Sequence, residues 1–287
     1  MKIAYSPCPN DTFIFHAWAN QLIATAPSVH VTFADIDQTN QWAQNTNDMD
    51  VMKISFAALP YVLNDYRLLP CGGALGRGCG PLLLTRQAPS TSMANAVDDY
   101  DGSMLTGKRI AVPSELSTAY LLFRLWAAKH IPDGIGEIVV MPFHHIMPAL
   151  QASDIDAGLV IHEARFTYQQ YGLHQLLDLG QWWEATTGHP IPLGAIIAKR
   201  TIEAQPIITA IRASLEHAWH HPESSEAYVL QHAQEMDRDV AKAHIDLYVN
   251  DFSYDLGEQG FNAVEALLLT AMKLQLVPQF DQKLLYD

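Results

Sequence analysis

The segment Lys2-Ile-Ala-Tyr-Ser-Pro-Cys-Pro-Asn-Asp-Thr-Phe13 decides how the first part of the chain folds. Its first five residues form a short apolar run that stops at two prolines, which predicts a β-strand. Asn10, Asp11 and Thr12 then offer side-chain oxygens that can cap a helix over residues 13–24. A strand followed at once by a helix is the first half of a βαβ unit.

The same alternation continues through the first 65 residues. Apolar alternation and short apolar runs predict two further strands, and polar segments with helical spacing follow each of them. The order is β-α-β-α-β-α, which is typical of a parallel sheet with helices on both faces. The predicted strands lie at 29–36 and 51–55, and the predicted helices at 37–47 and 56–64.

A second α/β unit begins at Lys108-Arg-Ile-Ala-Val-Pro113. It continues with helices at 118–130 and 146–152 and strands at 137–142 and 157–161. An apolar run at 193–198 is followed by helices at roughly 203–220, 223–235, 239–249 and 257–275. The chain therefore builds a first lobe, crosses to a second and returns near 193–200.

This order predicts an α/β protein with two lobes joined by a two-strand hinge. The larger lobe is discontinuous and comprises residues 1–106 and 199–287, and residues 107–198 form the smaller inserted lobe. The polar stretch 87–107 is predicted to be a surface insertion or an interdomain connection. An active site is expected in the cleft between the lobes, because α/β ligands bind beyond the carboxyl ends of the strands.

The formal net charge of the 287 residues is -14. Such a charge disfavours a nucleic-acid partner and an anionic membrane, both of which require clustered Lys and Arg. It leaves room for a small anionic ligand held by a few local donors. The N-terminus lacks the apolar stretch of a secretory signal, and the three cysteines show no CxxC spacing. We therefore expect a cytoplasmic protein with reduced thiols, and both a monomer and a homodimer remain open.

The glycine-rich segment Cys71–Gly80 contains five glycines in ten residues. The glycines do not stand in GxGxxG order, and the segment precedes a strand rather than a helix, so a phosphate-binding loop is disfavoured. We expect these glycines to let the backbone turn sharply before the strand at 81–85.

Two strand-to-helix junctions are candidate ligand sites. At Ser114–Tyr120 the free N–H groups of a helix start meet the hydroxyls of Ser117 and Thr118, which suits a carboxylate or a phosphate. Ser55 ends a strand in the first lobe, and the same argument applies to it. The alternative for each is an ordinary helix N-cap without a ligand.

Among the histidines, His162 is the candidate catalytic residue, because it directly follows the predicted strand at 157–161. A histidine there can act as a base near neutral pH, although a buried histidine bonded to the backbone is an equal alternative. His162-Glu163 lacks the second histidine of HExxH, and we expect no metal site. Cys8 has no evident base partner and is interpreted as a structural thiol.

The segment Ser6-Pro-Cys-Pro-Asn-Asp-Thr-Phe-Ile-Phe15 resembles the N-terminal signature of the 1,4-dihydroxy-6-naphthoate synthase family, which belongs to the futalosine route to menaquinone. Further segments resemble the family in the expected order and cover nearly the whole chain. Ser117 departs from a common Thr-Thr pair but keeps a hydroxyl. The further segments are residues 53–58, 72–81, 112–113 with 117–120, 157–168, 178–184, 192–195 and 248–250.

The resemblance implies a type II periplasmic-binding-protein-like fold and a cofactor-free lyase. Its substrate would be cyclic dehypoxanthinylfutalosine, and its products 1,4-dihydroxy-6-naphthoate and a three-carbon fragment. The histidine of the family's Ile-His-Glu segment, here His162, would be the base. Ser55, or the helix start at Ser117 and Thr118, would hold the substrate carboxylate, and Asp11 and Thr12 would line the crevice.

The competing function is a non-catalytic solute-binding protein for a small carboxylate. The fold does not separate the two functions, because both need a cleft and a hinge. The missing export signal favours the enzyme.

Overall fold

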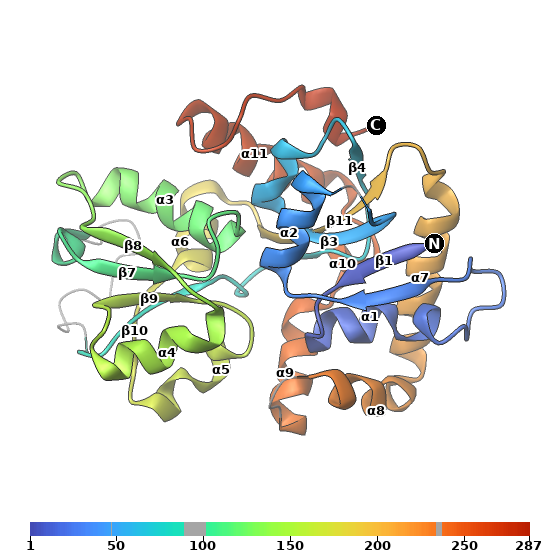
Figure 1. Cartoon of the computed structure of the whole chain (residues 1–287), viewed down its shortest axis with the longest axis horizontal. Coiled ribbons are helices and arrows are strands. Elements are labelled where there is room, and N and C mark those ends of the chain that lie inside the picture. The colour runs from blue at the N-terminus through green and yellow to red at the C-terminus, as the bar shows by residue number, and fades with distance from the viewer. Residues whose placement is uncertain (47, 89–101, 234–236) are drawn as a thin grey trace. The chain divides into compact units, whose positions relative to one another are not determined.

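The computed structural model describes residues 1–46, 48–88, 102–233 and 237–287. The chain divides into two compact units (Figure 1). Unit 1 comprises Met1–Gly76 and Pro192–Asp287, and unit 2 comprises Arg77–Ile191. None of the described helices is long and apolar enough to cross a membrane.

Unit 1 contains a mixed six-stranded sheet in the order β2-β1-β3-β11-β4, with β5 paired to β11. The first three strands are parallel, as the sequence predicts, but β11 runs antiparallel to both β3 and β4. The sheet is therefore not purely parallel, because the returning chain enters it in the opposite direction. Its strands are β1 (Lys2–Tyr5), β2 (His30–Phe33), β3 (Val51–Ser55), β4 (Tyr66–Leu68), β5 (Ala74–Gly76) and β11 (Ile191–Lys199).

The first helix begins earlier than the sequence pattern predicts. Helix α1 spans Pro9–Ala19 with Cys8 at the N-cap, so Asn10, Asp11 and Thr12 lie in its first turn and do not cap it. The ring of Pro9 fixes φ at a helical value and removes an N–H that would have no partner, so the helix can start there. Asp11 consequently lies at the positive end of the helix dipole.

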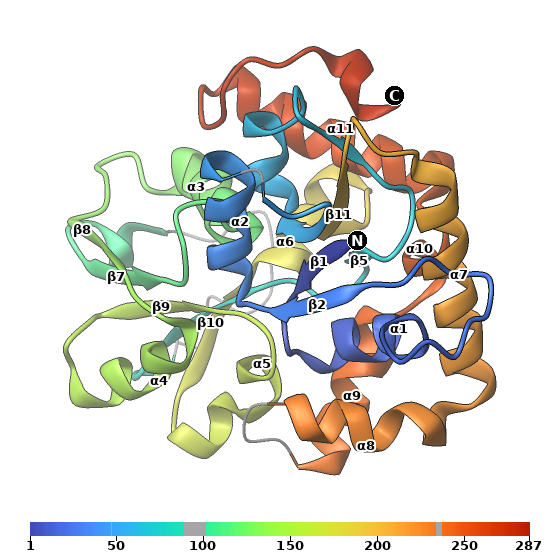
Figure 2. The ribbon, with the colours of Figure 1, turned by 45° about the vertical axis from the view of Figure 1, so that its right-hand side comes forward.

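The remaining helices of unit 1 cover both faces of its sheet. Helices α7, α8 and α9 pack against α1 on one face, while α2 packs on β3 and α11 packs on the turn after it (Figures 1 and 2). The predicted helix at 56–64 is instead the short 3-10 helix Phe56–Tyr61, because Pro60 cannot donate a helical hydrogen bond. The helices are α2 (Ile36–Asn45), α7 (Ala204–His220), α8 (Pro222–His232), α9 (Arg238–Tyr248), α10 (Asp251–Tyr254) and α11 (Gly257–Lys273), with a 3-10 turn at Gln282–Leu285.

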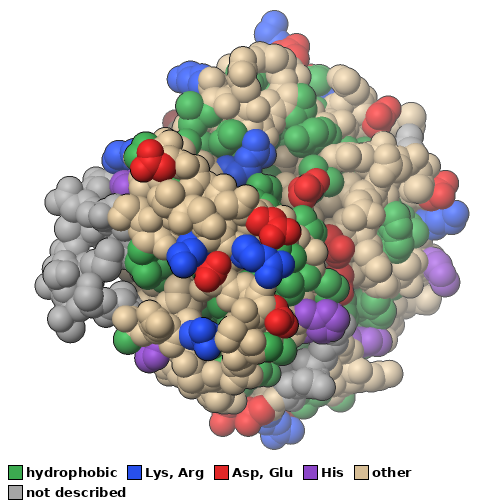
Figure 3. All heavy atoms as spheres, turned by 60° about the vertical axis from the view of Figure 1, so that its left-hand side comes forward, with side chains coloured by type: hydrophobic (Ala, Val, Ile, Leu, Met, Phe, Trp, Pro, Cys, Tyr) green, Lys and Arg blue, Asp and Glu red, His purple; other side chains and the backbone are tan. Residues whose placement is uncertain are grey.

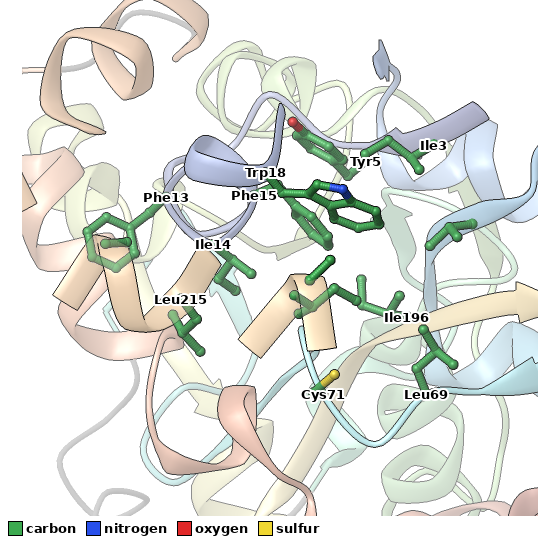
Figure 4. Packing of buried hydrophobic residues seen from close by; sticks show 14 of the residues in the cluster. Ile3, Tyr5, Phe13, Ile14, Phe15, Trp18, Leu69, Cys71, Ile196 and Leu215 are labelled. Atoms are coloured by element: carbon green, nitrogen blue, oxygen red, sulfur yellow. The ribbon is translucent and has the colours of Figure 1, made fainter. Parts of the chain in front are cut away.

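The core of unit 1 lies between the sheet and α1 with α7. Tyr5 and Phe15 stack with their ring centroids 4.6 Å apart, and Trp18 lies beside them above Ile196 of β11 (Figure 4). These aromatic side chains are almost fully buried. Burial of a large aromatic side chain contributes roughly 1.5–3 kcal/mol, so this layer anchors α1 on the sheet.

Unit 2 contains a five-stranded sheet in the order β10-β6-β9-β7-β8. Strand β7 runs parallel to both β8 and β9, whereas β6 runs antiparallel to β9 and β10. The strands are β6 (Leu82–Thr85), β7 (Arg109–Val112), β8 (Glu137–Val140), β9 (Ala157–Val160) and β10 (His174–Asp178).

Helices lie on both faces of this second sheet. In Figure 1, α3 and α6 lie above the sheet and α4 and α5 lie below it. The predicted bounds of α3 are confirmed, whereas β10 and α6 were not predicted, because β10 begins with two exposed polar residues. The helices are α3 (Thr118–His130), α4 (Phe143–Ala152), α5 (Ala164–Thr167) and α6 (Leu179–Thr187), with 3-10 turns at Gly102–Leu105 and Tyr168–Tyr171.

The boundaries between the units differ from the predicted 106/107 and 198/199. The chain leaves unit 1 after Gly76, because β6 pairs with β9 and β10 of the second sheet. It returns at Pro192, at the start of β11. Strands β5 and β11 are paired in unit 1, so both connections leave from neighbouring strands. The predicted insertion at 87–107 lies largely outside the described residues.

Candidate functional site

The carboxyl ends of β1 and β3 form one polar edge in unit 1. Their register pairs Ile3 with Val51 and Ala4 with Met52, so Ser6 and Ser55 follow at the same edge of the sheet. The first turn of α1 covers this edge. The polar residues that the sequence placed after these two strands are thus brought together.

Asp11 forms a buried ion pair with Lys53 of β3. The residues are only 1% and 3% exposed, and Asp11 also accepts hydrogen bonds from Ser6 Oγ and Asn10 Nδ2, each at 2.8 Å. A buried charge is tolerated only when paired and hydrogen-bonded in this way. The side chain of Lys53 passes over Gly194 of β11, where a Cβ would lie 2.6 Å from Lys53 Cε.

Lys53 was not predicted as a site residue. The signal was present in the sequence, because one lysine interrupts the buried run Val51-Met-Lys-Ile-Ser55. A lysine on a strand with no exposed residue needs a buried acid as its partner. The sequence alone could not say which of the chain's acidic residues supplies it.

Asn40 of α2 holds Ser55 by two hydrogen bonds. Asn40 Nδ2 donates to Ser55 Oγ at 3.1 Å, and the Ser55 backbone N–H donates to Asn40 Oδ1 at 2.8 Å. Both residues are buried. Because Ser55 Oγ accepts the hydrogen bond from Asn40, the hydroxyl proton of Ser55 can be donated to another oxygen. Asn40 is a second residue that the sequence analysis missed.

Thr12 lies where the sequence predicts, just after β1, but its side chain points into the unit. The residue is fully buried, and its hydroxyl donates to the carbonyls of Cys8 and Pro9 at 3.0 and 3.3 Å. These bonds stabilise the first turn of α1. The contacts of Asp11 and Thr12 therefore stabilise the carboxyl edge of the unit 1 sheet from within.

In unit 2 five segments meet at the carboxyl edge of the sheet. The segments after β7, β8 and β9 lie there because these strands are parallel. The start of β6 and the end of β10 also lie there, since Leu82 pairs with both Val160 and Asp178. Residues predicted from separate parts of the sequence, Ser117, Thr118 and His162, consequently share one edge.

Ser117 is the N-cap of α3. Its Oγ accepts a hydrogen bond from the Tyr120 N–H at 3.1 Å and donates to the Ser114 carbonyl at 2.8 Å. The side chain therefore caps α3, and whether a ligand also binds at this helix start stays a prediction. Thr118, the next residue, is also buried and begins the helix.

His162 lies two residues beyond the end of β9. It is half-buried, and its φ of +56° places it in the left-handed region, which is uncommon for residues other than glycine. Its ring meets the edge of the Phe143 ring at a centroid distance of 5.2 Å. The histidine is therefore not enclosed in the core, and its ring is oriented by an aromatic neighbour from α4.

The three cysteines carry free thiols and are buried. Burial raises the pKa of Cys71 to about 12, and it raises the pKa of Cys79 to about 12 as well. These two thiols stay protonated at neutral pH and cannot act as thiolate nucleophiles. Cys8 caps α1, which agrees with a structural role.

Charged side chains of both signs are interspersed on the face drawn in Figure 3. Lys and Arg side chains there lie among Asp and Glu side chains. Exposed ion pairs also occur elsewhere in the described residues, between Arg109 and Glu137 and between Lys242 and Asp246, independently of this view. Among the described residues on this face, the basic side chains do not form the continuous patch that phosphate-backbone binding requires.

Comparison with known proteins identifies the family. A family described as "Menaquinone biosynthesis" matches residues 1–273. The 1,4-dihydroxy-6-naphthoate synthase of Streptomyces coelicolor is 60% identical over 282 residues, which cover 97% of this chain and 95% of that protein. The chain belongs to the 1,4-dihydroxy-6-naphthoate synthase family. A second member of the synthase family, from Thermus thermophilus, is 39% identical over 274 residues, or 94% of this chain and 93% of that protein.

Solved structures confirm the predicted fold. A protein of Archaeoglobus fulgidus aligns with a TM-score of 0.85 and 31% identity over 96% of this chain and 98% of that chain. The periplasmic aliphatic sulphonate binding protein of Escherichia coli aligns with a TM-score of 0.67 over 99% of this chain and 90% of that chain. At 14% identity the second likeness shows the fold alone. This member of the synthase family has a periplasmic-binding-protein-like fold.

Proposed function

We propose that this protein is a carbon–carbon lyase that converts cyclic dehypoxanthinylfutalosine to 1,4-dihydroxy-6-naphthoate and a three-carbon fragment. The observation that carries the proposal is the 60% identity to a 1,4-dihydroxy-6-naphthoate synthase over 97% of the chain. The half-buried His162 at the carboxyl edge of the second sheet is a group of the kind that such a reaction needs. The reaction requires proton transfer and bond cleavage, and we propose no cofactor.

His162 is the proposed base. It removes a proton from the substrate, after which the carbon–carbon bond breaks by a retro-aldol-like or eliminative path. Formation of an aromatic product supplies the driving force. A positioned general base typically contributes a factor of about 10²–10⁴ to the rate. The contact of His162 with Phe143 supports this role, because it limits the orientations of the imidazole.

Donors at the two edges are the proposed carboxylate-binding groups. In unit 1 the hydroxyl of Ser55, held by Asn40, can donate to a carboxylate oxygen. In unit 2 the start of α3 at Ser117 and Thr118 presents the positive end of a thirteen-residue helix. We propose that Asp11 and Thr12 act by supporting the unit 1 edge, since their own polar atoms are engaged within it.

The proposed compartment is the cytoplasm. The three free, buried cysteines suit a reducing environment, where thiols persist without forming disulfides. A biosynthetic role is also in keeping with the family description.

The test is to incubate the purified protein with cyclic dehypoxanthinylfutalosine and follow the naphthoate chromophore. We expect turnover, and we expect His162→Ala to lower kcat by a factor of about 10²–10⁴. His174→Ala is the matched control, because His174 is an exposed histidine at the opposite edge of the same sheet. Binding without turnover would instead assign the chain to non-catalytic solute binding, and full activity of His162→Ala would remove His162 from the role of base.

A further inference from the structure

Arg165 joins three segments of unit 2 at the edge where His162 lies. Its Nη1 donates to the Gly80 carbonyl at 2.6 Å, and its Nη2 donates to Asp178 Oδ2 at 2.7 Å. The Arg165 side chain is 16% exposed and the Asp178 side chain 2%. Arg165, Gly80 and Asp178 are called the Arg165 clamp below. Each comes from a different segment among those that carry the family resemblance.

Both ends of the His162 turn are tied to the start of β6. At one end Val160 of β9 pairs with Leu82 of β6. At the other end Arg165 binds the carbonyl of Gly80, two residues before Leu82. The intervening backbone is a tight turn in which the Arg165 N–H donates to the His162 carbonyl at 3.3 Å.

This turn stores backbone strain at His162. A left-handed residue other than glycine costs of order 1–3 kcal/mol and persists only when its surroundings fix it. The φ of His162 is +56°. The Arg165 clamp is one of the contacts that can fix this turn. Its guanidinium is charged and binds two acceptors at once in a fixed geometry.

The acceptors of the clamp are themselves fixed. Asp178 Oδ1 accepts from the Gly180 and Gln181 N–H groups and caps α6, so only Oδ2 faces the arginine. Gly80 lies directly against Gly180, and a Cβ on Gly80 would stand 2.2 Å from the Gly180 nitrogen. The two acceptors therefore cannot shift to follow a displaced Arg165.

We propose that Arg165 is a positioning residue that holds the His162 turn in its strained conformation and so places the imidazole for proton transfer. This role rests on the proposed function of His162. In this proposal the position of the His162 imidazole depends on the guanidinium of Arg165 and on its two acceptors. These acceptors are Asp178 at the end of β10 and Gly80 in the segment before β6. Arg165 acts through the backbone of the turn.

The first test measures the turn without reference to the reaction. Arg165→Lys keeps the charge but offers one donor position in place of the two-armed fork. We expect amide hydrogen exchange of residues 161–166 to accelerate by roughly tenfold or more, since strained turns open when a tie is lost. The matched control is Arg109→Lys, because Arg109 also binds a carboxylate and a carbonyl, those of Glu137 and Asp154, at the opposite edge of the same sheet. Unchanged exchange in Arg165→Lys would overturn the proposal, whatever the enzyme does.

The second test links the turn to catalysis. We expect Arg165→Lys to lower kcat by roughly tenfold to a hundredfold with KM changed less than about threefold, because a displaced catalytic group weakens the chemical step more than binding. Asp178→Asn keeps an oxygen to cap α6 but removes the Oδ2 acceptor, and should reproduce this effect. The double variant should lose less than the product of the two single losses.

The outcomes separate this inference from the proposed function. If His162→Ala loses activity while Arg165→Lys keeps the wild-type kcat, the positioning role is refuted and the role of His162 stands. If His162→Ala keeps full activity, the proposed base is refuted, and the exchange measurement alone decides whether Arg165 holds the turn. An equal fall in kcat for Arg165→Lys and Arg109→Lys would also refute the positioning role of Arg165. The loss of activity would then not be specific to the arginine that contacts the His162 turn.

Discussion

The carboxyl edges of the two sheets both hold a buried ion pair, Asp11 with Lys53 in unit 1 and Asp178 with Arg165 in unit 2, but they differ in one polar side chain. In unit 1, Asp11, Lys53 and Ser55 are buried and bonded to one another or to Asn40. In unit 2, His162 is half-buried beside Phe143, and its backbone rather than its ring carries the strain. The polar groups named in unit 1 are all buried, whereas unit 2 adds a half-buried imidazole to its buried polar groups. The comparison shows that polarity at a strand end does not by itself mark the reacting group.

The largest effect is expected from breaking the unit 1 ion pair. Lys53→Met leaves Asp11 as a buried carboxylate without its cation, which should lower the free energy of unfolding by roughly 3–5 kcal/mol. Urea unfolding followed by circular dichroism measures it. Lys242→Met is the control, because it removes a lysine from an exposed pair, and its effect should be a small fraction of that value.

A double variant sharpens that result. Asp11→Asn combined with Lys53→Met removes both charges and should recover a large part of the lost stability, since the cost comes from the unpaired charge. Equal unfolding midpoints for Lys53→Met and the wild type would show that this edge is not held by the ion pair.

A smaller effect is expected in unit 2 from the α3 cap. Ser117→Ala removes the acceptor for the Tyr120 N–H and should cost about 1 kcal/mol of stability. Thermal unfolding measures the loss. Ser117→Thr keeps a hydroxyl at the N-cap and should remain near the wild type. If alanine and threonine behave alike, the hydroxyl of Ser117 does not stabilise α3.

The smallest effect is a pH dependence in unit 1. Burial, with a further contribution from His217, lowers the pKa of His16 from its usual 6.5. The His16 Nδ1 atom is buried and has no hydrogen-bond partner among the residues that the structure describes. The unfolded chain therefore binds more protons than the folded one as pH falls below 6.5. The contribution of His16 to stability is complete above that pH and is lost as pH falls through the lowered pKa.

The substitution that tests this dependence is His16→Phe, which keeps an aromatic ring beside Tyr228. Unfolding free energies measured between about pH 7 and pH 5 should fall less steeply for the variant than for the wild type. Part of the slope should remain, because burial also lowers the pKa of His232 on α8. If the free energy of unfolding changes equally with pH in the variant and the wild type, His16 does not contribute to the pH dependence of stability.

The sequence determined the local features of the fold. The prolines and the short run at the N-terminus marked β1, and the short run at residues 51–55 marked β3. Ser117 with the apolar helix after it marked α3 with the observed bounds. These features depend on dihedral preferences and side-chain periodicity within a few residues. The ordered motifs also led to the synthase family, which the comparisons confirm.

The tertiary structure alone decided how the local features combine. The partners of Lys53 and Arg165 lie 42 and 13 or more residues away along the chain. The antiparallel direction of β11 in its sheet follows from the return of the chain, and β6 runs antiparallel to β9 where the chain has entered unit 2. Periodicity indicates which face of a segment is buried but not which distant side chain meets it. The family resemblance in the sequence thus implied His162 as the candidate base. Only the fold showed that Arg165, three residues further on, binds Gly80 and Asp178, because these contacts exist only once three separate segments have come together.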